Sequence, residues 1–143
     1  MAIASDHAGF SLKELLKTHL NSRFEVLDLG TNSEASVDYP DYAQSLAKAI
    51  LSKQAERGIL ICGSGVGIGI AANKFKGIRA AICHDTYSAH QGVEHDHMNV
   101  LTLGARIIGE ELAKEVVETF VNAVPSQDER HLRRVSKVEA LEQ

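Results

Sequence analysis

The chain has 143 residues, of which 44% are hydrophobic and 24% charged, and its formal net charge is −4. This length fits one domain, residues 1–143, with a real hydrophobic core. The acidic balance argues against a nucleic-acid surface, and no stretch suggests a membrane span or a secretory leader. We therefore expect one soluble domain in the cytoplasm, with no nucleic-acid or membrane partner.

Short apolar runs alternate with amphipathic segments through the first half of the chain. Residues 2–4 read as a minimal strand, and leucines at helical spacing predict a helix over residues 12–20. A second strand, 26–29, ends at Gly30, and a helix that begins near Pro40 continues to residue 51. Residues 59–62 form a β-branched run typical of a strand that is buried on both faces.

The same alternation continues in the second half. It predicts strands at 78–83 and 99–103, a helix at about 86–94, a long helix over 112–121 and a charged C-terminal helix. Repeated strand–helix units predict an α/β fold with a parallel sheet and helices on both faces. Ligands of such sheets bind beyond the carboxyl ends of the strands, so we expect the chemistry there.

The stretch after the third strand carries the strongest functional signal. Glycines stand at alternate positions, Gly63, Gly65, Gly67 and Gly69, and a helical segment follows. The backbone N–H groups of such a turn hold a phosphate or an oxyanion. Cys62 precedes the turn, where its thiolate form is stabilised and can act as a base or nucleophile. The alternative is a small buried hydrophobic residue before a turn.

Neither of two familiar nucleotide-binding motifs is present in this stretch. The dinucleotide fingerprint needs a third glycine where the sequence has Ile68 or Ile70, and the phosphate loop of NTPases needs Gly before lysine, whereas Asn73 precedes Lys74. The turn therefore predicts oxyanion or phosphate binding without a nucleotide.

Polar residues follow the other predicted strands as well. Each has a structural alternative, as a helix cap, a surface residue or a turn former. Their convergence on one sheet edge favours an active site. They are Asp6 and His7 after the first strand, Ser64 after the third, His84 and Asp85 after the fourth, and Arg106 after the fifth.

Two further clusters lie elsewhere. His95, Asp96 and His97 precede the last strand, which places them at the amino edge, roughly 17 Å from the glycine turn at ~3.3 Å per residue. They form either a solvated loop or part of another subunit's site. Arg130 and Arg134 are one helical turn apart and could clamp a phosphate or form a solvated helix face.

Cys62 and Cys83 are the two cysteines, and each ends a predicted strand. A disulfide would require neighbouring strands. Free thiols are the expectation for a cytoplasmic chain.

Six segments together resemble type B ribose-5-phosphate isomerase, whose superfamily includes galactose-6-phosphate and allose-6-phosphate isomerases. They are Asp6–Phe10, Val37–Pro40, Cys62–Gly67 with Ala71–Lys74, Gly77–Ala80, Asn99–Leu101 and Gly104–Arg106. The resemblance covers nearly the whole chain in order. It implies a Rossmann-like three-layer α/β/α sandwich with a five-stranded parallel sheet, in a homodimer or dimer of dimers with shared active sites.

The resemblance also implies the chemistry, an interconversion of ribose 5-phosphate and ribulose 5-phosphate. Cys62 would move a proton between C1 and C2 of the open-chain sugar, and His95 would open the furanose ring with help from Asp6. The enediolate would be stabilised by the Ser64 hydroxyl and by the turn amides, those of Gly63, Gly65, Val66 and Gly67 among them. No metal or redox cofactor is needed for this exchange.

The remaining substrate contacts follow from the same resemblance. The phosphate would be bound by His7, Arg130 and Arg134, and Arg106 and Tyr39 would be further substrate-binding residues. Asp96, where the chain leaves the family pattern, is placed at the sugar end because its carboxylate would be repelled by the phosphate. The sequence departs from the family pattern where Asp96 and His97 follow His95 in place of Asn-Asp, and where Ser64 replaces a threonine.

Three alternatives stay open at this point. The substrate could be a six-carbon sugar phosphate, or the chain could bind sugar phosphates without catalysis. A metal-dependent hydrolase could use His84, Asp85, His95 and His97, although their spacing matches no recognised ligand set.

Overall fold

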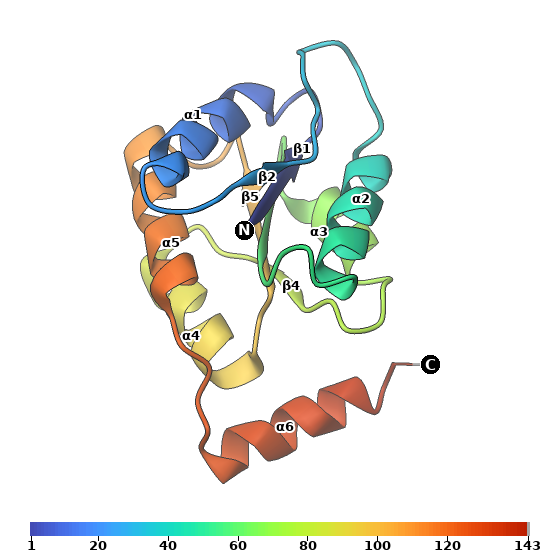
Figure 1. Ribbon diagram of the computed structural model, residues 1–143, viewed down its shortest axis with the longest axis vertical. Coiled ribbons are helices and arrows are strands. Elements are labelled where there is room, and N and C mark those ends of the chain that lie inside the picture. The colour runs from blue at the N-terminus through green and yellow to red at the C-terminus, as the bar shows by residue number, and fades with distance from the viewer. Residues whose placement is uncertain (143) are drawn as a thin grey trace.

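The computed structural model describes residues 1–142 as one twisted parallel sheet with helices on both faces (Figure 1). The strand order is β2-β1-β3-β5-β4. The strands are β1 (Ala2–Ser5), β2 (Leu27–Asp28), β3 (Gly58–Cys62), β4 (Ala80–Ile82) and β5 (Val100–Gly104). All pair in parallel, as the strand–helix alternation predicts. The expected five-stranded parallel sheet is confirmed.

Two helices cover one face of the sheet and three cover the other, which confirms the three-layer sandwich. The first pair is α2 (Tyr39–Leu51) and α3 (Val66–Ala72). The opposite layer contains α1 (Phe10–Asn21), α4 (Thr86–Asp96) and α5 (Glu110–Asn122). A sixth helix, α6 (Glu129–Glu139), lies outside both layers.

The three central strands hold the two halves of the core apart. Alternate side chains of a strand point to opposite faces, so each strand contributes to both halves. The side chains that meet α1, α4 and α5 are fully buried: Ile3, Ile59, Ile61, Leu101 and Leu103. Each such burial contributes about 1.5–3 kcal/mol. Ala2, Ala4 and Leu60 face α2 and α3, where the small alanines admit the α2 helix closely.

The fourth strand is shorter than the sequence predicts. The expected strand 78–83 contracts to Ala80–Ile82. Ile78 N–H donates to the Phe75 carbonyl in a turn, and Arg79 N–H donates to Oδ1 of Asn99. Because the N–H groups of Ile78 and Arg79 make these local hydrogen bonds, they are not available for strand pairing, and β4 begins only at Ala80.

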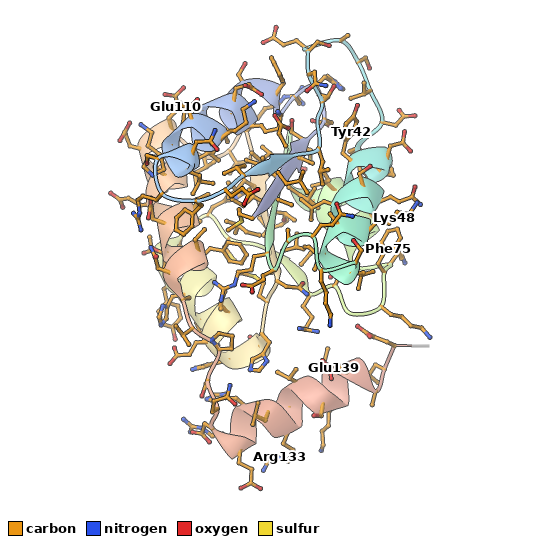
Figure 2. The ribbon with its side chains drawn as sticks, viewed as in Figure 1. Tyr42, Lys48, Phe75, Glu110, Arg133 and Glu139 are labelled. Atoms are coloured by element: carbon orange, nitrogen blue, oxygen red, sulfur yellow. The ribbon has the colours of Figure 1, made fainter. Side chains whose placement is uncertain are left out.

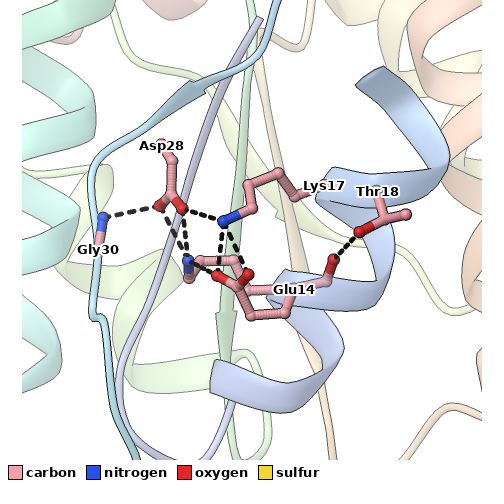
Figure 3. A network of polar contacts seen from close by, with 6 residues as sticks. Glu14, Lys17, Thr18, Asp28 and Gly30 are labelled. Carbon is pink, nitrogen blue, oxygen red and sulfur yellow. Dashed lines mark hydrogen bonds and ion pairs between the residues drawn. The ribbon is translucent and has the colours of Figure 1, made fainter. Parts of the chain in front are cut away.

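A charged network joins α1 to β2 (Figure 3). Nζ of Lys13, a side chain with no exposed surface, lies 2.8 Å from Oδ2 of Asp28, and Nζ of Lys17 lies 2.7 Å from the same oxygen. Burial alone would raise the pKa of Asp28, but the hydrogen bonds from these two ammonium groups outweigh it and lower that pKa. The pair fixes the short edge strand, which shares only two register positions with β1.

Helix α6 crosses the end of the molecule at which the strands begin, and it contacts α4 there (Figure 1). Figure 2 shows Glu139 on the side of α6 toward the body and Arg133 on the outer side. Nη1 of Arg79 lies 3.3 Å from Oε1 of Glu139, and Val135 is 7% exposed. A groove of about 780 Å³ remains between α6 and the body, lined by Phe75, Ile78, Met98, Val135 and Val138 among others.

Cys62 and Cys83 are both free and buried. Their strands, β3 and β4, are separated by β5, so no disulfide can join them without rearrangement. The expectation of free thiols is confirmed. In the part of the chain that the structure describes, no helix is both long and apolar enough to cross a membrane.

Candidate active site

The site lies where the strand order reverses, between β1 and β3. Strand β1 pairs with β2 on one side and with β3 on the other. The chain passes from β1 through α1 to β2, and then through α2 to β3 on the opposite side of β1. A crevice forms beyond the carboxyl ends of the strands at such a switch point. Asp6 and His7 follow β1, and Cys62 ends β3, so the fold brings the two polar segments to one crevice.

The thiol of Cys62 faces the glycine turn. It is 5% exposed, and its Sγ accepts a hydrogen bond from Gly65 N–H at 3.1 Å. Gly65 has φ +81°, and a Cβ there would lie 3.0 Å from the carbonyl carbon of Leu103. Glycine is therefore needed for both the backbone conformation and the space. The turn delivers an N–H to the sulfur, so the backbone holds this thiol in place at the crevice.

Ser64 is exposed on the outer side of the same turn. Its Oγ accepts from Val66 N–H at 3.2 Å, which leaves the hydroxyl proton available to donate. The ring of Tyr39, which is 40% exposed at the start of α2, packs against Gly67. A Cβ on Gly67 would lie only 2.8 Å from Cζ of Tyr39. The structure thus brings Cys62, Ser64 and Tyr39 together.

Arg106 borders the turn on the β5 side. Its backbone N–H donates to the Gly63 carbonyl at 3.1 Å, and a Cβ on Gly63 would lie 3.0 Å from Nη1 of Arg106. Gly63 thus leaves room for the guanidinium, which lies beside the turn as the sequence predicts.

Asp6 and His7 complete this edge. Asp6 is 7% exposed, and its Oδ1 accepts from Ala8 N–H at 3.0 Å and Gly9 N–H at 3.1 Å. The structural role expected as an alternative, capping the turn before α1, is therefore present. Nδ1 of His7 accepts from Val37 N–H at 3.2 Å, so a neutral ring carries its proton on Nε2.

His84, expected at the carboxyl edge and as a ligand in the hydrolase alternative, makes a backbone contact at the tip of the sheet. Its Nε2 accepts from Gly104 N–H at 2.9 Å, at the end of the strand that pairs with Cys62. Its position directly after a predicted strand indicates that it lies at the carboxyl edge of the sheet. Its contact with Gly104 of β5 can be predicted only when the strand order is known. The neighbouring thiol differs from Cys62: burial, then the charge of Asp85, raises the pKa of Cys83 to about 11.

The second cluster lies at the opposite, amino edge. His95 is the penultimate residue of α4, which ends just before β5 starts, and Asp96 is exposed beside it. His84 and Asp85 precede the other end of this 11-residue helix, about 16 Å away at ~1.5 Å per residue. The structure therefore separates the four ligands of the hydrolase alternative.

Helix α6 joins His95 at this edge. The rings of His95 and His131 are stacked, with centroids 4.0 Å apart and planes 13° from parallel. Arg130 and Arg134 flank His131 on the helix and are exposed. Burial, then the charges of His95 and Arg130, lower the pKa of His131. No function is predicted for His131 from the sequence, where its place between two arginines is the only signal.

Comparison with known proteins decides the family. A family model described as Ribose/Galactose Isomerase matches residues 1–138. The chain belongs to this family. The isomerase family also accounts for the fold: a structure of Clostridium thermocellum ribose-5-phosphate isomerase B superposes with a TM-score of 0.95 at 46% identity, covering 99% of this chain and 95% of that one. The resemblance and the expected enzyme class are confirmed.

Named members of the isomerase family differ in substrate. Ribose-5-phosphate isomerase B of Escherichia coli is 46% identical over 144 residues, which span 100% of this chain and 96% of the relative. D-erythrulose-4-phosphate isomerase of Pectobacterium atrosepticum is 43% identical over 125 residues, 86% of this chain and 82% of that protein. The reaction class is common to both names, whereas the sugar is not.

Proposed function

We propose that this isomerase interconverts ribose 5-phosphate and ribulose 5-phosphate through an enediolate. The observation that carries the proposal is the hydrogen bond from Gly65 N–H to Sγ of Cys62, inside the crevice at the switch point. Similarity to ribose-5-phosphate isomerase B over the full chain supports this choice of sugar. Both cysteines are free thiols, as cytoplasmic proteins keep them, and we place the reaction in the cytoplasm.

In the proposed reaction, the thiolate of Cys62 takes the proton from C2 of the open-chain aldose. The C–H electron pair forms the C1–C2 double bond, and the carbonyl electrons move to O1. The same proton returns to C1, while the O2 proton moves to O1, so the ketose forms without an oxidant or reductant. The negative oxygen is stabilised by Ser64 and by the turn amides at the start of α3.

The ring-opening group comes from a second copy of the chain. Cys62 and His95 lie at opposite edges of one sheet, so a single chain cannot bring both to one sugar. A two-fold dimer places the amino edge of each chain against the carboxyl edge of its partner. His95 would then act as the acid and base of ring opening, with Asp6 assisting from the Cys62 edge.

Apolar surface on the chain supports this association. Val66 and Ile70 of α3 are 48% and 59% exposed, and Ile82 of the edge strand β4 is 41% exposed. The groove between α6 and the body is also lined by apolar side chains. Association that buries both surfaces would yield a homodimer or a dimer of dimers.

The phosphate and the sugar hydroxyls would be bound across the same interface. His7 offers Nε2–H from one chain, and Arg130 and Arg134 of α6 offer guanidinium donors from the other. Tyr39 and Arg106 border the turn and would contact the sugar. We place the Asp96 carboxylate at the sugar end, since it would repel the phosphate.

A coupled assay tests the function. Ribose 5-phosphate, allose 6-phosphate, galactose 6-phosphate and erythrulose 4-phosphate are compared at equal concentrations. The proposal expects the highest kcat/KM for ribose 5-phosphate. A higher value for any of the other sugars would reassign the substrate, and binding without turnover of any sugar would support a non-catalytic module.

A further inference from the structure

His131 makes an unusual contact with the proposed ring-opening residue. Its ring lies 4.0 Å from that of His95 and within 13° of parallel, so the two imidazoles share a face. His131 is 4% exposed, whereas the His95 side chain is 33% exposed. One ring of the stack is therefore enclosed and the other is open to a ligand.

The two ring nitrogens of His95 contact other residues of α4. Nδ1 lies 3.0 Å from Nε2 of Gln91, one helical turn earlier, and Nε2 lies 3.8 Å from a carboxylate oxygen of Glu94. Ser126 N–H donates to the Glu94 carbonyl at 2.8 Å, which attaches the segment before α6 to the same turn of α4. Gln91 fixes the direction of the ring, and His131 fixes its plane.

Charges from both helices decide which ring can be protonated. Glu94 of α4 lies beside His95 and pairs also with His90, and the charges of Asp128, Arg130 and Arg134 act on His131 from α6. Two imidazolium ions in a stack repel each other, so the pair takes up one proton before the other. Burial, then the charges of His95 and Arg130, lower the pKa of His131, so this enclosed ring is the one held neutral.

We propose that His131 is a positioning residue for ring opening: stacked on His95, it fixes the plane of the His95 imidazole and leaves His95 as the ring that exchanges a proton with the sugar. This inference rests on the proposed function of His95. It differs from a purely structural role, in which the stack would only attach α6 and its arginines to α4.

The first test is the titration of His131 in the unmodified protein. NMR titration of the histidine rings, with signals assigned from His95→Gln and His131→Phe variants, reports protonation without any assay of activity. We expect His131 to stay neutral to a pH below the ordinary imidazole value of about 6.5. Protonation of His131 at or above that value would overturn the proposal, whether or not the protein isomerises ribose 5-phosphate.

The second test uses kinetics. His131→Ala should lower kcat at least ~tenfold with KM changed less than ~threefold, because the loss falls on a proton-transfer group rather than on binding. His131→Phe keeps a flat neutral ring and should recover to within ~threefold of the parent. Equal losses in both variants, or a rise in KM alone, would show a structural role.

An isotope effect identifies the step. With ribose 5-phosphate deuterated at C2, the isotope effect on kcat should fall toward unity in His131→Ala, because slow ring opening would precede the cleavage of the C2–H bond. A reduced kcat with an unchanged isotope effect would overturn the proposal. Arg133→Ala, on the outer face of α6, is the matched control and should resemble the parent. Failure of the parent to turn over ribose 5-phosphate would instead reject the proposed function.

Discussion

The backbone N–H of Gly65 donates to Sγ of Cys62 at 3.1 Å, a contact that depends on the left-handed backbone of Gly65. Since this thiol is the proposed base, Cys62→Ala should lower kcat at least ~thousandfold, the order typical of removing a general base. Substrate binding, measured by calorimetry, should remain.

Cys83→Ala is the control for the Cys62 variant. Cys83 is also a free and buried thiol, and burial together with the charge of Asp85 raises its pKa to about 11. Its replacement should leave kcat within ~threefold of the parent. Near-parental turnover in Cys62→Ala would exclude this thiol as the base.

Arg130→Ala and Arg134→Ala should raise KM more than they lower kcat. A phosphate remote from the reacting carbons is bound alike in the ground state and the transition state. Steady-state kinetics with ribose 5-phosphate measures the split, with Arg133→Ala as the control because its side chain lies on the outer side of α6. An unchanged KM with a collapsed kcat would instead place the arginines in the chemical step.

Mixtures of two inactive variants test the shared site. Cys62→Ala and His95→Ala chains should each be inactive alone, and subunit exchange should restore activity, because one site of each hybrid dimer contains both residues intact. Exchange is followed by mass spectrometry of differently tagged chains. Confirmed exchange without recovered turnover would rule out a site formed between chains.

The charged network of α1 predicts a loss of stability in acid. Asp28 has a lowered pKa in the folded chain, so its contribution is complete above the unfolded value of about 3.9 and disappears as the pH falls through the folded value. Urea unfolding should show this decline below about pH 4 in the parent, and a shallower decline in Asp28→Asn.

At neutral pH the same Asp28→Asn variant should lose up to about 3 kcal/mol, because the fully buried Lys13 ammonium loses Asp28 and keeps only the partly exposed Glu14 carboxylate as a partner. Lys17→Met is the matched control: it removes the outer ammonium but preserves the buried pair. An equal loss in the two variants would show that burial of Lys13 is not the source of the effect.

The sequence predicted those parts of the fold that local periodicity encodes. The run before Cys62, the glycines after it and the strand–helix alternation were enough to expect a parallel sheet with a site at its carboxyl edge. The separation of His95 from Cys62 also followed from chain order alone, because His95 precedes a strand and Cys62 ends one.

Contacts between distant segments could not be predicted in the same way. The burial of Lys13 depends on Asp28 in a strand 15 residues later, and helical periodicity gives no sign of that partner. The stack of His95 on His131 depends on how α6 returns to α4 after Pro125. His84 finds its partner on β5 only because β5 lies between β3 and β4. These features are set by tertiary packing.

The placement of Cys62 and His95 at opposite edges of one sheet has a consequence for the behaviour of the enzyme on dilution. In the proposed shared site, a separated chain retains its complete fold and yet has no complete site. Specific activity would then depend on protein concentration through mass action, falling as dimers dissociate while the circular dichroism of the chains remains that of the native fold. Loss of function and loss of structure would be two separate transitions.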